Sequence, residues 1–490
     1  MQGEEEDRGT PLALPGGPPI YIQIYEHMRA AIEQGDFRIG ERMPSEREIQ
    51  RRFHVSRMTA QSAYRKLEDM GYVLRHPTQG TFVAARPQWP SAVRKEARFT
   101  PSKSWRHLGG HFLEDLMESG SHAYRFDFEV GRPDMDLFPN ASMQLLLEDL
   151  LTRKPSEVLM YSATAGLPAL REAIARRLLP LRGMDRLGVE HVLVTTGAMQ
   201  AIDLIAKLFI DPDDLVVVER PTFPGAIQRF RAQGARFAEV PVDGGGLDVE
   251  RLEQVLRDLH PRLIYIQPCA QNPTGATLSA ERRKAVLALA RDYNVPIVED
   301  DAGGFFADGP GERSLKSDDV DDLVLHIGTF SKLIAPGLRV GYIVAPANIV
   351  RLLTSVKQMT DLHTGPIPQL LLEGWLMSSD VPAHVAFARQ AYAARLSAAL
   401  AELEDGPLQP VLRPRAGIYL FCRISSGLPA CTLQQRSAEH GVVFAPGDEF
   451  SPTGELGDHL RLCVSGLSAA SIHVGLRRLK QLLREITSEA

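Results

Sequence analysis

Residues 323–339 read LVLHIGTFSKLIAPGLR, and this stretch decides how we interpret the larger part of the chain. Its apolar start, Leu323–Ile327, predicts a buried strand, and the run Gly328-Thr329-Phe330-Ser331-Lys332 follows directly. A lysine in this place can form an imine with an aldehyde. Nearby hydroxyl and guanidinium groups are the donors that a phosphate attracts, and three are at hand: Thr329, Ser331 and Arg339.

Polar segments follow other apolar runs in the same way. After the run His191–Thr196, the segment Gly197-Ala198-Met199-Gln200 predicts the start of a helix, whose free N–H groups and positive dipole end suit a phosphate. The run Val295–Glu299 ends at Asp300, a carboxylate placed to pair with a protonated pyridine nitrogen.

Two further residues offer contacts to a flat, substituted ring. Asn272 lies on the turn Gln271-Asn272-Pro273-Thr274-Gly275 and is placed to donate to a ring hydroxyl, and Phe223 offers a flat face for stacking. Taken singly, most of these segments have an ordinary structural interpretation. Their order and spacing over at least five segments indicate a site for a phosphorylated cofactor.

From about Arg125 onward, strand-like apolar runs alternate with amphipathic helical stretches. Runs such as Leu215–Val218 and Leu263–Gln267 are short and lack polar alternation, which is typical of strands buried on both faces. This rhythm predicts an α/β domain with a largely parallel sheet that is covered by helices on both sides.

Together these segments resemble the fold-type I aminotransferases, particularly the branch with kynurenine and 2-aminoadipate aminotransferases. The resemblance implies pyridoxal 5′-phosphate as cofactor, a large domain with a mostly parallel seven-stranded sheet, and a smaller α+β C-terminal domain. It also implies that Arg461, in Leu460-Arg461-Leu462-Cys463-Val464-Ser465, binds a carboxylate bidentately. Tyr161 is implied to reach the cofactor phosphate of a neighbouring subunit, so a homodimer is expected.

One departure from that family concerns the residues after Asp300. The family usually has a tyrosine two or three residues later, where it donates to the ring hydroxyl. Here the chain reads Asp301-Ala302-Gly303-Gly304, so that donor is missing. We expect cofactor binding to survive on the remaining contacts, whereas the sequence leaves open whether full transamination turns over.

A separate module precedes this domain. Helix-compatible residues run from Ile22 to Gln34, and Ser45 with Glu48 predicts a capping box for a second helix. Ser56 is placed to cap a third helix, whose apolar face is expected to hold five residues: Ala60, Ala63, Tyr64, Leu67 and Met70. Short strands over Tyr72–Arg75 and Thr81–Val83 then predict a hairpin suited to a wing.

Residues 44–83 resemble the winged helix-turn-helix of the GntR family. Other faces of the third helix carry side chains of the types that contact phosphates and base edges in double-stranded DNA. We expect the contacts to come from six residues: Arg47, Ser56, Arg57, Thr59, Gln61 and Gly80. Residues 47–66 hold six basic side chains and one acidic side chain, although the whole chain has a net charge of −6.

The fusion of these two modules resembles the MocR subfamily of bacterial transcriptional regulators. The resemblance implies a domain-swapped, head-to-tail homodimer that senses an amino compound, or pyridoxal phosphate itself, through the imine at Lys332. The alternative is an amino-acid aminotransferase that carries a DNA-binding-like appendage. We expect a disordered tail over 1–18, the winged helix-turn-helix over 19–85, a linker over 86–124, and the cofactor domain over 125–490, divided at about residue 366 into large (about 175–365) and small (about 366–490) subdomains.

Composition sets the remaining expectations. The 44% hydrophobic and 24% charged content is typical of a soluble globular protein, and no apolar run is long enough for a membrane span. The acidic N-terminus is not a secretory signal, so we expect a cytoplasmic protein. The four cysteines lack metal-ligand spacing, which predicts no metal site; they are Cys269, Cys422, Cys431 and Cys463.

Overall fold

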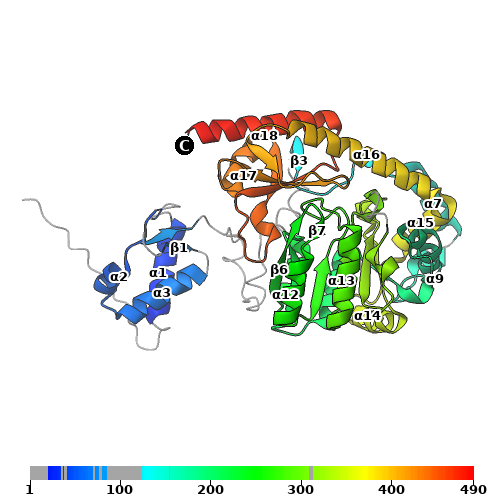
Figure 1. The fold of residues 1–490 in the computed structure, drawn as a ribbon, viewed down its shortest axis with the longest axis horizontal. Coiled ribbons are helices and arrows are strands. Elements are labelled where there is room, and N and C mark those ends of the chain that lie inside the picture. The colour runs from blue at the N-terminus through cyan, green and yellow to red at the C-terminus, as the bar shows by residue number, and fades with distance from the viewer. Residues whose placement is uncertain are drawn as a thin grey trace, which may run out of the picture. The chain divides into compact units, whose positions relative to one another are not determined.

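The chain forms two compact units, which are described separately below. The computed structural model describes residues 20–34, 37, 41–69, 72–76, 80–84, 124–153, 155–307 and 313–489 (Figure 1). The predicted tail and residues 86–123 of the predicted linker lie outside the described residues, as do Met70 and Gly71.

The N-terminal unit has three helices and a hairpin among its described residues: α1 (Ile20–Gln34), α2 (Glu46–Phe53), α3 (Arg57–Asp69), β1 (Val73–His76) and β2 (Gly80–Val83). The predicted capping box is confirmed, because Ser45 Oγ accepts from the Glu48 backbone N–H while the Glu48 carboxylate accepts from the Ser45 N–H. The predicted cap of α3 is also confirmed, since Ser56 Oγ accepts from the Thr59 N–H at 3.1 Å. Both caps fix where the helices begin.

One apolar cluster holds this unit together. The predicted inner face of α3 is buried at its four described positions, and Tyr25, Met28 and Ile32 of α1 pack against it. The two strands of the wing pair antiparallel, with Val73 opposite Val83 and His76 opposite Gly80. The polar side of α3 is therefore left facing outward.

The second unit is built on an eight-stranded sheet within the described residues, in the order β4-β11-β10-β9-β8-β5-β6-β7. Strands β10, β9, β8, β5 and β6 are parallel, whereas β11 runs antiparallel to β10 and β4. The predicted sheet had seven strands, and the observed sheet has one more because the two-residue strand β7 pairs with β6. The strands are β4 (Val192–Thr195), β5 (Leu215–Arg220), β6 (Arg236–Asp243), β7 (Gly246–Leu247), β8 (Leu263–Ile266), β9 (Ile297–Asp300), β10 (Val324–Thr329) and β11 (Gly341–Val344).

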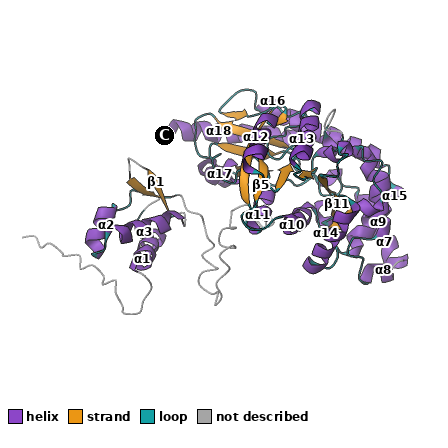
Figure 2. Ribbon diagram, turned by 60° about the horizontal axis from the view of Figure 1, so that its bottom comes forward, coloured by secondary structure: helices purple, strands orange, loops and turns teal. Residues whose placement is uncertain are grey.

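Alternate residues of these strands enter two different cores. Val218, Tyr265 and Val298 face helices α10 (Ala198–Phe209), α11 (Pro224–Ala232) and α14 (Ala347–Thr360). Val217 and Ile264 face α12 (Val249–Leu259) and α13 (Ala280–Tyr293) on the other side of the sheet (Figure 2). Both faces are covered, which explains why the strands read as continuous apolar runs.

A second sheet of five strands lies in the same unit, in the order β12-β13-β15-β14-β3 among the described residues. It covers a core shared with helices α16 (Val381–Glu402), α17 (Ala430–Glu439) and α18 (Ala469–Glu489). Its strands are β3 (Phe126–Phe128), β12 (Leu408–Pro410), β13 (Tyr419–Ile424), β14 (Val442–Pro446) and β15 (His459–Cys463).

The chain passes between the two sheets more than once. Strand β3, from the start of the unit, pairs with β14 of the smaller sheet. Helix α15 (Pro366–Ser378) instead packs against α7 (Asn140–Arg153), α8 (Pro155–Leu159) and α9 (Pro168–Ala173). Segments far apart in the sequence thus belong to the same layer, and the division near residue 366 stays a prediction. In the described part of the chain, no helix has the length and apolar character needed to cross a membrane.

Candidate functional site

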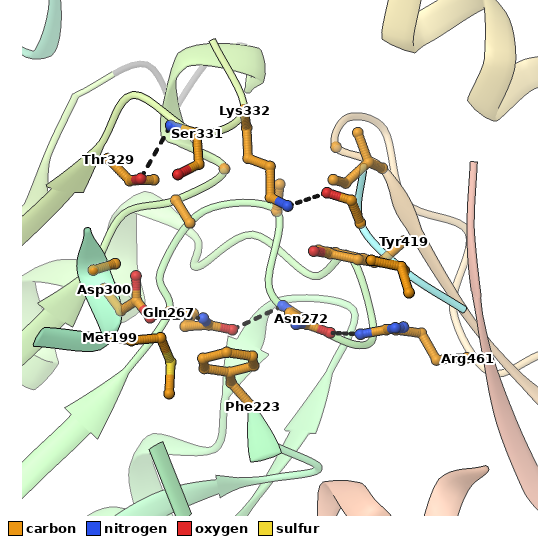
Figure 3. Close-up of a pocket in the computed structure, with 18 of the residues that line it drawn as sticks. Met199, Phe223, Gln267, Asn272, Asp300, Thr329, Ser331, Lys332, Tyr419 and Arg461 are labelled. Carbon is orange, nitrogen blue, oxygen red and sulfur yellow. Dashed lines mark hydrogen bonds between the residues drawn. The ribbon is translucent and has the colours of Figure 1, made fainter. Parts of the chain in front are cut away.

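A cavity of about 400 Å³ opens where the parallel strands of the large sheet end. The loops after β4, β5, β8, β9 and β10 all reach it, as expected for a sheet whose parallel strands share one carboxyl edge. In Figure 3, Lys332 enters from one side and Phe223 from the opposite side, while Asp300 and Arg461 face each other across the space. Residues far apart in the sequence thus meet in one pocket.

Lys332 follows β10 and brings its amine into this cavity. Its Nζ donates to the carbonyl oxygen of Gly131, beside the hydroxyl of Tyr419. A Cβ atom at Gly131 would lie 2.8 Å from Nζ and 2.9 Å from the Tyr419 hydroxyl, so a larger residue there would displace one of these two groups. Burial, with smaller contributions from the guanidinium groups of Arg461 and Arg339, lowers the pKa of Lys332 to about 8. A neutral, nucleophilic amine is therefore accessible near neutral pH.

Asp300 ends β9 and is held by two donors on the neighbouring strand. The Tyr265 hydroxyl donates to its Oδ2 at 2.7 Å, and Gln267 Nε2 donates to the same oxygen at 3.2 Å. Its Oδ1 is buried and has no hydrogen-bond partner among the described residues. Burial raises the pKa of Asp300, and the two donors partly offset this. The free oxygen is suited to a cationic N–H group in the cavity.

Asn272 and Arg461 continue this hydrogen-bonded chain. Gln267 Oε1 accepts from the Asn272 backbone N–H at 2.9 Å, and Asn272 Oδ1 accepts from Arg461 Nη1 at 3.2 Å. Arg461 also donates to the Glu129 carbonyl and lies over the ring of Tyr419, 4.9 Å from its centroid. Its Nε is buried, without a partner in the part of the chain that the structure describes. The guanidinium is held firmly and keeps a donor free.

The opposite end of the cavity has the features of a phosphate site. Gly197, with φ of 83°, caps α10, so the first N–H groups of that helix are free of intrahelical partners at Ala198 and Met199. A Cβ at Gly197 would lie 2.8 Å from Arg339 Nη2. The remaining predicted phosphate donors also line this cavity: Thr329, Ser331 and Arg339.

Phe223 and Met199 form one wall. Gly225 follows Phe223 on α11, and a Cβ there would lie 2.6 Å from the Phe223 ring and 2.8 Å from Met199 Sδ. The ring, the sulfur and the helix are thus in close contact, which holds the aromatic face against the cavity.

The N-terminal unit presents a different kind of surface. On α3, Arg57 and Gln61 are exposed, with 79% of the Arg57 side chain accessible to solvent. Arg47 is exposed on α2, whereas Thr59 is half-buried and bonds to Ser56 through its hydroxyl at 2.8 Å. Gly80 begins β2 with φ of 113°. The three long polar side chains are therefore open to solvent, although Arg57 Nε lies 4.0 Å from a carboxylate oxygen of Glu46, while Ser56 and Thr59 also support the helix start.

Comparison with known proteins assigns a family to each of the two units. Residues 126–479 match the model of aminotransferase class I and II, and residues 20–83 match the bacterial regulatory proteins of the gntR family. The chain belongs to the aminotransferase class I and II family. A gntR-family domain precedes the family's fold, the combination found in MocR-type regulators.

Relatives of two kinds are similar to this chain. The HTH-type transcriptional regulator TauR of Rhodobacter capsulatus is 31% identical over 96% of this chain and 98% of its own length. The 2-aminoadipate transaminase of Thermus thermophilus is 34% identical over 76% of this chain and 93% of its own. The crystal structure of LysN, an alpha-aminoadipate aminotransferase from Thermus thermophilus complexed with N-(5′-phosphopyridoxyl)-L-leucine, superposes with a TM-score of 0.74 at 31% identity and covers 80% of this chain and 98% of LysN.

Against this family, the segment after Asp300 shows how the missing tyrosine is accommodated. A Cβ at Gly303 would lie 2.9 Å from Ala270 Cβ, and one at Gly417 would lie 2.8 Å from the same atom. Arg182 holds the segment from behind through a buried ion pair with Asp301, at 2.9 Å from both carboxylate oxygens. The backbone is closed around a small side chain at position 270, so no tyrosine fits at 303 without movement.

Tyr161 is the predicted cofactor residue that the structure does not bring into the cavity of its own chain. Its side chain is 84% exposed and meets the ring of His363 edge-on, with ring centroids 5.7 Å apart. The sequence missed four residues of the site: Tyr265, Gln267, Gly131 and Tyr419. Tyr265 and Gln267 lie in a run that we interpreted only as a strand, and the polar ending of that run was the available signal.

Proposed function

We propose that this protein is a transcriptional regulator that binds operator DNA through its N-terminal unit and senses an amino compound, or the cofactor itself, at Lys332. One observation carries the proposal: a single chain combines a capped, basic helix α3 with a cavity lined by Lys332, Asp300 and Arg461. TauR, whose name is that of an HTH-type transcriptional regulator, is similar to this chain over nearly its full length.

The cofactor is pyridoxal 5′-phosphate, which supplies an aldehyde and an electron-accepting ring when bound. The residues fit this group. Asp300 Oδ1 is a buried acceptor to which no described residue donates, which suits a protonated ring nitrogen. Lys332 offers an amine of lowered pKa, and the start of α10 offers free N–H groups to a phosphate.

The remaining residues would bind and orient the amino compound. Arg461 binds its carboxylate, because the guanidinium is fixed by Asn272 and the Glu129 carbonyl and retains a free Nε. Lys332 Nζ, next to the Tyr419 hydroxyl, holds or moves a proton at the carbon that bears the amino group of this compound. A ligand alters DNA binding only if it favours one of two conformations of the chain.

A cytoplasmic homodimer, domain-swapped and head-to-tail, is part of the proposal. Exposed Tyr161 supports it, since this side chain lies outside the cavity of its own chain and adjoins two exposed apolar residues, Leu159 and Met160. In such a dimer Tyr161 would reach the cofactor phosphate of the second copy.

The test combines two readouts on the purified, cofactor-loaded protein. Operator DNA from upstream of its own gene is titrated by fluorescence anisotropy, with and without single amino acids, while the visible spectrum is recorded. A regulator changes its DNA affinity when the spectrum shifts. The proposal fails if neither pyridoxal phosphate nor any amino acid alters operator binding.

The second candidate is an aminotransferase of an amino acid, favoured by the retention of Lys332, Asp300 and Arg461 in one pocket. In that case an amino acid should remove the visible band, and an α-keto acid should restore it over repeated cycles. A band that shifts with the amino acid but is unaffected by the keto acid would exclude turnover.

A further inference from the structure

A second arginine, Arg229 on α11, lines the same cavity as Arg461. Its Nε is buried and has no hydrogen-bond partner among the described residues. Arg461 also keeps its Nε free, so two guanidinium groups in one pocket hold unused donors. A buried donor without an acceptor is unfavourable, which makes a ligand acceptor valuable at this place.

Neighbouring arginines show that the free donor is particular to Arg229. Arg231, two residues later on the same helix, donates to the Pro452 carbonyl at 3.0 Å and lies over the Phe237 ring. Arg220, at the end of β5, pairs with Glu455 at 2.8 Å. Both have a structural role that accounts for them, whereas the contacts of the described residues give Arg229 none.

Within the described part of the chain, the acidic residues of the cavity form no ion pair with Arg229. Glu129 accepts from Gln434 at 3.2 Å, and both Glu129 and Glu449 have further partners. Asp300 is held by Tyr265 and Gln267 and directs its free oxygen to the cavity. Among the described residues that line the cavity, Arg229 is therefore an arginine that has no part in the proposed contacts to the cofactor or to the first carboxylate and no ion pair with a protein carboxylate.

We propose that Arg229 binds a second acidic group on the effector, so that the protein selects amino acids with an acidic side chain. The inference rests on the proposed function, in which the amino group of the effector is sensed at Lys332 and Arg461 binds its first carboxylate. The planar fork of arginine matches a carboxylate or a sulfonate, and two separated guanidinium groups match a ligand with an anion at each end.

The experiment compares ligands of similar length that differ at the far end. L-glutamate, L-glutamine and L-norvaline are titrated into the cofactor-loaded full chain, with the visible spectrum as readout. Wild type is expected to bind glutamate at least about tenfold more tightly than the two neutral amino acids. In Arg229→Gln, glutamate should bind about as tightly as the neutral amino acids. Arg257 is an exposed arginine on α12, and Arg257→Gln should leave the preference for glutamate unchanged.

Arg229→Lys adds a variant that keeps the charge, and it should retain part of the preference. Equal preference in wild type, or a preference that survives in Arg229→Gln, overturns the inference. Loss of the cofactor band in Arg229→Gln with normal binding in Arg229→Lys also overturns it, because Arg229 would then serve the cofactor.

Glutarate and butyrate separate this inference from the proposed function, since neither has an amino group. Glutarate binding is measured by calorimetry. If it depends on Arg229 while no amino acid changes the operator affinity, the inference about Arg229 holds and the proposed sensing function is rejected. L-homocysteate distinguishes the two anions: tighter binding than glutamate assigns a sulfonate, and weaker binding assigns a carboxylate.

Discussion

The two functional regions of this protein are built in opposite ways. Three candidate DNA-binding side chains on α2 and α3, those of Arg47, Arg57 and Gln61, are exposed, close in sequence, and not hydrogen-bonded to one another within the described part of the chain. The cofactor pocket is buried, and its residues come from segments between Glu129 and Arg461 that are linked by hydrogen bonds. Substitutions on the first surface should therefore act locally, whereas those in the pocket should act through their neighbours.

The largest effect is expected for a substitution in the cofactor pocket. Lys332→Ala should abolish the visible absorbance of bound pyridoxal phosphate, because no other lysine is among the described residues that line the cavity. Spectroscopy of the purified protein measures this, with Lys284→Ala, exposed on α13, as the control. A visible band that persists in Lys332→Ala would contradict the assignment.

Asp300→Asn should weaken cofactor binding by about tenfold to a hundredfold, because it removes a charge-assisted bond. Tyr265→Phe removes one of the two donors to Asp300 and should cost only a few-fold. Titration of the cofactor-free protein measures both affinities. If Tyr265→Phe were as damaging as Asp300→Asn, the hydroxyl would do more than position the carboxylate.

On the exposed side, Arg57→Ala should lower operator affinity by about tenfold and leave cofactor binding unchanged. Anisotropy at two salt concentrations tests this, with Arg257→Ala as a variant of equal charge change on α12. A loss of cofactor in Arg57→Ala would remove the contrast between local and coupled regions.

The pH dependence of cofactor loading follows from the lowered pKa of Lys332. The protonated amine cannot attack an aldehyde, so the loading rate should rise with pH and level off above about pH 8. An unperturbed lysine, with a pKa of 10.5, would still gain rate well above pH 9. Stopped-flow absorbance distinguishes the two profiles.

The smallest effect is expected at Glu219, a buried carboxyl that accepts from the Gln267 backbone and the Gln271 side chain. Burial raises its pKa from 4.5 to about 8, so the folded protein keeps a proton that the unfolded chain has lost. Stability therefore falls as pH rises between these values. Glu219→Gln should raise the Tm by about 2 °C at pH 8 and by less toward pH 5, as measured by scanning fluorimetry.

The sequence by itself determined the elements and their chemistry. Capping residues such as Ser45 and Ser56 act within one turn, and the strand runs are apolar because both sheet faces are covered, so local patterns were sufficient. The residue types at Lys332, Asp300 and Arg461 likewise indicated the cofactor, and the spacing of the segments carried the resemblance to the family.

Only the tertiary structure decided which residues meet. Tyr265 lies on β8 and Gln267 directly follows that strand, and both reach Asp300 because β8 pairs with β9. Tyr419 lies close to Lys332 because the smaller sheet packs over the strand ends. The tight corner of Ala270, Gly303 and Gly417 joins three distant segments. Such contacts depend on strand order and burial, which are properties of the whole fold and leave no pattern in a local stretch of sequence.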